Sequence, residues 1–311
     1  MKATKLYSGY FGCDKCNQKG EWFGRVTFPE TAVQLRTDES FRQFQQEEHH
    51  HGLSPFTELA IDMTDNFPID YMHQVCLGVM KRLLLIWIRG ERRNRISATH
   101  VKVVSERLMN LQRYVPDNFA RKPRGLEDRW KAVEYRQFLL YTGHIVLKDI
   151  LSAQLYDHFM CLSVAVCILV NDTLSQKHNV YAHELLVYFV ERGKALYGDE
   201  FLVYSVHSLI HLPRESVVHG SLENSSAWKF ESFMQVLKKL VRSGKNPVAQ
   251  VVKRITEQNM SAAASGCLNV GKRSARNSFS TKLHNNACSL RNGYFCEIIM
   301  WISNRRMWLV I

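Results

Sequence analysis

Residues 204–241 read YSVHSLIHLPRESVVHGSLENSSAWKFESFMQVLKKLV and combine a pair of histidines with an acid at the start of a helical pattern. His207 and His211 stand four positions apart, so a helix would place both imidazoles on one face. Glu231 opens a predicted helix whose apolar residues recur with the helical period. The helix dipole alone stabilises a first-turn acid, so Glu231 is either a ligand for a catalytic metal or an ordinary helix-start acid.

A second pair of metal ligands lies far upstream, in the motif Cys13-x-x-Cys16. Two thiolates at this spacing bind one Zn²⁺, and the histidine pair supplies the other half of a tetrahedral site. Of the eight cysteines only these two have motif spacing, which indicates a reduced intracellular protein rather than a disulfide scaffold. We predict one structural zinc site formed by Cys13, Cys16, His207 and His211. The alternatives are unpaired thiols and hydrogen-bonded core histidines.

The charge balance favours a polyanionic partner. Lys and Arg number 41 against 29 Asp and Glu, which gives a formal net charge of +12. DNA, bound without sequence preference and in a salt-dependent way, is the predicted partner, although many basic intracellular proteins bind no nucleic acid. The basic residues that we assign to DNA contact could equally form a solvated surface. They are Lys238, Lys239, Arg242, Lys245, Arg121, Lys122 and Arg124.

Helical patterns dominate the chain, which predicts a mainly α fold. We expect helices near residues 67–89, 98–114, 128–143, 150–170, 181–197, 228–243 and 247–258, with a short strand within 22–28. Residues 261–277 are typical of a linker, and 288–302 predict a β-hairpin around Asn292-Gly293. Neither a secretory signal nor a run of about 18 apolar residues is present, so no membrane partner is expected. The predicted divisions are 1–90, 91–205, 206–258 and 259–311.

Asp70-x-x-His73 is a further candidate site, because both side chains face the same side of a helix start. Asp70 has a simpler interpretation as the acid that caps the helix.

Taken together and in this order, the motifs resemble the transposases of CACTA (EnSpm) type elements and their animal relatives. The motifs are GCDKC at 12–16, RTDE at 36–39, DYMH at 70–73, WKA at 130–132 with RQFLLY at 136–141, and the segment from His207 to SAWKFE at 226–231. The resemblance implies an RNase H-like (α/β) core interrupted by a large helical insertion, with 1–90 and 206–258 as core and 91–205 as insertion. It implies nuclear cut-and-paste DNA transposition by an Asp-Asp-Glu triad that binds Mg²⁺ or Mn²⁺.

On this resemblance, Glu231 corresponds to the last triad residue, Asp70 and His73 to the family's DxxH motif, and the four Cys and His residues to its zinc ligands. Both catalytic aspartates of the family lie upstream of the CxxC, whereas the twelve residues before Cys13 contain no acid. We therefore expect a truncated domain without strand transfer. Its remaining function is either non-enzymatic DNA binding or protein interaction around a structural zinc, and a homo-oligomer is compatible with the sequence.

Overall fold

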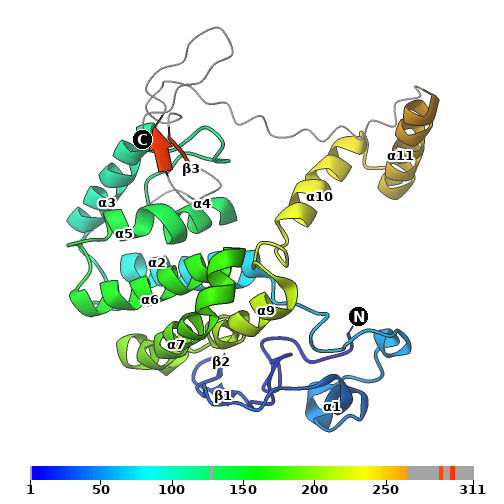
Figure 1. The fold of residues 1–311 in the computed structure, drawn as a ribbon, viewed down its shortest axis with the longest axis horizontal. Helices are drawn as coiled ribbons and strands as arrows, with labels where there is room; N and C mark the ends of the chain where they lie inside the picture. Colours follow the sequence, from blue (N-terminus) through cyan, green and yellow to red (C-terminus); the bar gives the residue numbers. More distant parts are fainter. Residues whose placement is uncertain (1, 127–128, 265–286, 290–294, 298–311) are drawn as a thin grey trace. The chain divides into compact units, whose positions relative to one another are not determined.

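The computed structural model describes residues 2–126, 129–264, 287–289 and 295–297, and these residues are mainly helical, as the sequence predicts. The chain divides into two compact units (Figure 1). The first comprises the residues up to Gln112 together with Arg121–Ser226, and the second comprises Arg113–Ala120 and the residues from Ala227 onward. Both candidate metal-ligand pairs belong to the first unit.

The first unit begins with short elements and continues as a helical array. The strands β1 (Glu21–Trp22) and β2 (Val26–Thr27) pair in antiparallel fashion. The helices that follow are α1 (Asp38–Arg42), η1 (Glu47–His49), η2 (Pro55–Glu58), η3 (Met72–Met80), α2 (Lys81–Arg89), α3 (Ala98–Leu111), α4 (Ala132–Gln137), η5 (Phe138–Thr142), α5 (Gly143–Val146), α6 (Ala153–Leu169), α7 (Asp172–Tyr197), η6 (Asp199–Phe201), α8 (Tyr204–His207), η7 (Ser208–His211) and α9 (Leu212–His219). The short helix η4 (Gln112–Tyr114) follows α3, and only its first residue belongs to the first unit.

The core of the first unit centres on α6 and α7, which pack side by side. Residues of α6 at spacings of three and four are fully buried, including Phe159, Leu162 and Val166. They meet the buried face of α7, where Phe189 stacks on His158 with ring centroids 4.0 Å apart. This apolar spacing is the helical period that the sequence shows, so packing and local propensity agree.

The starts of three predicted helices differ from the structure by four residues or more. The helix expected from 67 begins only after Asp70, because that carboxylate accepts a hydrogen bond from the Met72 amide and caps the chain there. The helix expected from 181 already begins at Asp172, since Asn171 caps it and the chain continues through a kink at His178. The helix expected from 128 begins at Ala132, where Glu134 reaches back to the Lys131 amide.

Two helical segments have a π geometry that apolar spacing does not predict. They are η3, which continues directly into α2, and η5, which joins α4 to α5. A π-helix changes the side of the helix on which the following residues lie. Such segments are frequent at functional sites.

The second unit holds α10 (Trp228–Leu240) and α11 (Pro247–Ala264). None of the residues of α10 is buried, although its sequence is amphipathic. The helix α11 extends to Ala264, so it continues into the predicted linker, whose remainder lies outside the described residues. The strands β3 (Ala287–Ser289) and β4 (Phe295–Glu297) pair in antiparallel fashion as the hairpin prediction requires, with Asn292-Gly293 outside the described residues. Among the described helices, none is both long and apolar enough to span a membrane.

Candidate metal centre

The two cysteines lie in a tight loop near the start of the first unit. Gly12 precedes them at a point where an added Cβ would stand 2.3 Å from the Leu6 carbonyl oxygen, so a larger side chain would displace the loop. The loop is tied to the following segment by a backbone hydrogen bond from the Asn17 amide to Gln34 and by a bridge between Cys16 and Leu35. Both cysteines are fully buried, which directs their thiols into the protein.

The two histidines come from a helical segment that changes type between them. His207 is the last residue of α8, and His211 is the last residue of the 3₁₀ turn η7. Both imidazoles are buried, and their ring centroids lie 5.2 Å apart. Phe28 stacks on His207 with its centroid 5.4 Å away, which fixes that ring from one side. The predicted spacing therefore brings both histidines to one side of the chain, although the segment is not a continuous α-helix.

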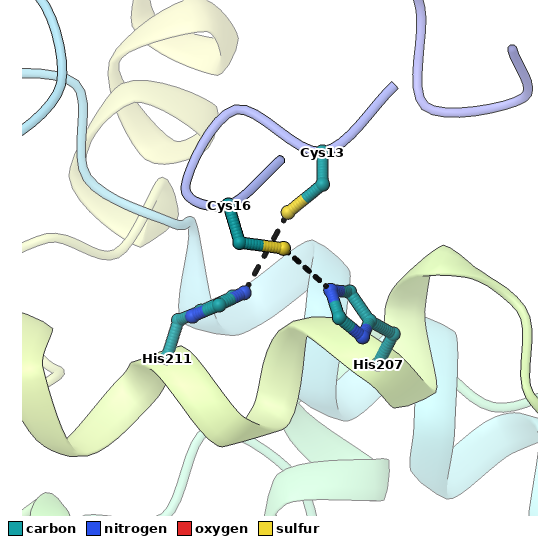
Figure 2. A group of neighbouring side chains, drawn as sticks. All are labelled: Cys13, Cys16, His207 and His211. Atoms are coloured by element: carbon teal, nitrogen blue, oxygen red, sulfur yellow. Dashed lines mark hydrogen bonds between the residues drawn. The ribbon is translucent and has the colours of Figure 1, made fainter. Parts of the chain in front are cut away.

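The cysteine loop and the histidine segment converge (Figure 2). Cys13 Sγ lies 3.6 Å from His211 Nε2, and Cys16 Sγ lies 3.2 Å from His207 Nε2. The four ligand atoms all lie within 4.8 Å of one another. Usual Zn–S and Zn–N bond lengths in a tetrahedron give a sulfur–nitrogen separation of about 3.6 Å. The predicted convergence is therefore present, and its dimensions suit a small tetrahedral cation.

The electrostatics of the two thiols differ. Burial alone would raise the pKa of the Cys13 thiol, but hydrogen bonds from Cys16 and both histidines lower that pKa well below its usual value. The pKa of the Cys16 thiol is raised by the hydrogen bond between Cys16 and Cys13 and by burial. A divalent cation bound here would hold both cysteines as thiolates and displace their protons.

Buried polar groups hold the ligands in place. Arg36 is almost fully buried, and its Nε donates to the Cys13 carbonyl oxygen at 3.0 Å. In the side-chain orientation that satisfies its hydrogen bonds, the Gln18 amide nitrogen donates to His207 Nδ1 at 3.2 Å. In the same orientation the Gln18 amide oxygen accepts from the Glu30 backbone amide at 2.7 Å. Partners of this kind orient the ligands of a metal and tune its binding.

A buried ion pair joins the same two segments without using the metal ligands. Lys15, between the cysteines, places its Nζ 2.6 Å from Glu215 Oε1, which follows His211 by four residues. Both side chains are nearly inaccessible to solvent. Lys15 also donates to the Thr64 carbonyl oxygen, and Glu215 accepts from the Ile69 amide. We call this pair the Lys15–Glu215 clamp, because it fixes the distance between the cysteine loop and the histidine helix.

Other predicted site residues lie outside this cluster. Asp70 caps η3 and contacts the ring of His73 through Oδ2 and Nδ1, so the capping interpretation accounts for its position. Glu231 is exposed in the first turn of α10. Within the described part of the chain, Cys13, Cys16, His207 and His211 are the one group of three or more potential metal ligands.

The predicted DNA-contact residues fall into two groups. Lys238, Lys239, Arg242 and Lys245 are exposed in or just after α10, in the second unit. In the first unit, Arg124 donates to both carboxylate oxygens of Glu134, at 2.6 and 3.0 Å, and therefore has a structural partner. Arg121 is exposed, and Lys122 is partly buried.

The supporting residues Lys15, Glu215, Gln18 and Arg36 are not predicted from the sequence. Their nearest indication is positional: Lys15 lies between the two cysteines, and Glu215 follows His211 by one helical turn. Comparison with known proteins adds no relative, since no protein-family model, curated protein or solved structure matches the chain. The function of the centre must therefore be inferred from its geometry and chemistry.

Proposed function

We propose that the protein is a zinc-stabilised DNA-binding module with the layout of a CACTA-type transposase domain. The convergence of Cys13, Cys16, His207 and His211 supports this most, because the resemblance assigns these four residues as zinc ligands on motif order alone. Two thiolates and two imidazoles are typical of structural zinc, and four protein ligands leave no open position for a substrate. The resemblance would make residues 1–90 and 206–258 the remnant of an RNase H-like core, with 91–205 as the helical insertion.

Basic side chains support DNA as the partner, and hence a nuclear location. The net charge of +12 is a long-range attraction for phosphate. Lys238 and Lys239 lie exposed in the last turn of α10, and their side chains make no hydrogen bond or ion pair within the described residues. Exposed lysines of this kind neutralise phosphates and release counterions, so binding should weaken as salt rises.

The test measures the binding of the zinc-loaded full chain to a short labelled duplex over a range of salt concentrations. We expect log Kd to depend linearly on log salt, with a slope that falls by about 0.9 for each phosphate contact removed in a Lys238→Ala, Lys239→Ala, Arg242→Ala variant. Gln235→Ala, at an exposed neutral position on the same helix, is the matched control and should leave the slope unchanged. No binding at about 50 mM salt, or a salt-independent affinity, would contradict DNA binding.

The same preparation tests the proposed lack of strand cleavage. With Mg²⁺ or Mn²⁺, the protein should neither nick nor join DNA, because two-metal chemistry needs several carboxylates around the ions. Glu231 belongs to no group of three or more potential ligands among the described residues. Metal-dependent cleavage that disappears in Glu231→Gln would show instead that the family's enzymatic function is retained.

A further inference from the structure

The first unit contains a cavity next to the metal centre, and none of the four ligands lines it. The cavity measures about 570 Å³, a size within the range of small-molecule sites. Tyr7 and Tyr204 line it, together with Leu77 of η3. The two tyrosine rings have centroids 6.2 Å apart and are tilted by 33°. Apolar and aromatic surface therefore dominates the interior, which suits a flat ring.

The polar residues that line the cavity carry hydrogen-bond donors and no acid. Arg25, at the tip of the β1–β2 hairpin, is exposed and makes no side-chain hydrogen bond or ion pair within the described residues. Ser8 and Ser205 contribute hydroxyl groups. His73 turns its Nδ1 toward Asp70, which leaves Nε2 for a ligand. Such groups bind a phosphate and the polar edge of a base.

A neighbouring arginine increases the positive potential at Arg25. Arg82 donates to the Glu200 carbonyl oxygen at 2.7 Å, while its buried Nε has no partner in the described structure. Burial, and then the charge of Arg25, lower the pKa of Arg82, so the two guanidinium groups repel each other. The Glu200 carboxylate, close to Gly24, offsets part of this repulsion. An anion bound at Arg25 would relieve the rest.

We propose that this cavity binds one unpaired nucleotide, with its base against Tyr7 and Tyr204 and its phosphate at Arg25. A base in duplex DNA is stacked on both faces and cannot enter, whereas a free nucleotide or an unpaired nucleotide of a single strand offers the same base and phosphate. Aromatic side chains with a basic neighbour are the usual platform for single-stranded nucleic acid. This site is independent of the duplex contacts proposed for α10.

The metal centre should shape the cavity, because α8 carries residues of both. Tyr204 and Ser205 line the cavity, and His207 ends the same helix turn. Phe28 connects them: its ring meets Tyr204 edge-on at 6.3 Å and stacks on His207. Variants that test the cavity should therefore leave the metal ligands intact.

The test measures the binding of zinc-loaded full chain to an oligothymidylate of about 12 nucleotides, thymidine 5′-monophosphate, thymidine, inorganic phosphate and a duplex, by calorimetry. Tyr7→Ala should weaken oligothymidylate binding about 5- to 100-fold, the range for loss of one base stack, and Arg25→Glu should weaken it at least about tenfold. The matched controls are Tyr10→Ala, an exposed tyrosine of the same segment, and Lys177→Glu, an exposed cation on α7. Both should change the affinity less than about twofold.

The ligand series identifies the source of the nucleotide. Equal affinity for the monophosphate and the oligonucleotide assigns the cavity to a free nucleotide, and tighter oligonucleotide binding assigns it to a strand. Three results would overturn the proposal. They are Tyr7→Ala and Arg25→Glu binding the oligothymidylate no more weakly than their controls, equal dependence of duplex binding on both residues, and inorganic phosphate binding as tightly as thymidine 5′-monophosphate. The cavity variants lie outside α10. Duplex binding can therefore be absent while the cavity still binds nucleotide, and nucleotide binding can be absent while duplex binding remains.

Discussion

The segment from residue 2 to 69 and the helix pair α6–α7 belong to one unit but are held together by different forces. In the segment the longest regular element is α1, with five residues, and the buried apolar side chains are few. Its connections to the helices include the four Cys and His residues, the Lys15–Glu215 clamp, the Arg214–Asp65 ion pair and the hydrogen bond from the Phe28 amide to the Leu202 carbonyl oxygen. In α6 and α7, continuous apolar faces meet. Polar contacts, together with a metal where one binds, can thus support a segment whose apolar core is small.

The largest expected effect separates these two regions directly. Removing the metal with a chelator should expose the backbone amides of residues 2–69 to hydrogen exchange, because binding energies of structural zinc reach about 10 kcal/mol or more. The amides of α6 and α7 should stay protected, since their apolar contacts do not involve the site. Equal loss of protection in both regions would contradict the comparison.

Core truncation should affect the helix pair most. Phe159 is fully buried in α6, with the rings of Trp87 and Phe138 at centroid distances of 5.9 and 6.2 Å. Phe159→Ala should lower the free energy of unfolding by about 3–5 kcal/mol in urea denaturation. Val180→Ala, at an exposed position on α7, should change it by less than about 0.5 kcal/mol. A loss below about 1 kcal/mol for Phe159→Ala would show that this core is not close-packed.

Breaking the clamp should have a somewhat smaller effect. Glu215→Gln leaves the Lys15 charge buried without its partner, and we expect a loss of about 3 kcal/mol. The neighbouring Arg214 forms an exposed ion pair with Asp65, so Arg214→Gln should cost less than about 1 kcal/mol. Adding Lys15→Met to Glu215→Gln should recover part of the stability. Additive losses in the double variant would argue against a direct interaction.

The smallest predicted effect is a pH dependence within the helix pair. Burial lowers the pKa of His158 to about 4, and its Nε2 donates to the Phe189 carbonyl oxygen. The unfolded chain protonates His158 more readily than the folded chain does. The contribution of neutral His158 to stability is therefore complete above about pH 6.5 and is lost as the pH falls toward 4. Between pH 7 and pH 5 the free energy of unfolding should fall by about 2 kcal/mol from this cause, and the fall should be smaller in His158→Gln. An unchanged difference would assign the acid sensitivity to other groups.

The sequence predicted the local features of this structure better than the non-local ones. The apolar period predicted α3 and α6 to within three residues, and ligand spacing predicted that His207 and His211 act together with the CxxC. The clamp was not predicted, because Lys15 and Glu215 are 200 positions apart and no sequence pattern pairs them. The cavity around Tyr204 is lined in part by η3, whose π geometry apolar spacing does not show.

X-ray absorption at the zinc edge, on protein purified without chelator, tests the central claim most directly. The proposed centre predicts one zinc per chain, with two sulfur neighbours at about 2.3 Å and two nitrogen neighbours at about 2.0–2.1 Å. His211→Ala should remove one nitrogen neighbour or the metal itself. Protein that folds without zinc, or a metal shell that lacks sulfur, would contradict the claim that Cys13, Cys16, His207 and His211 form a structural zinc site.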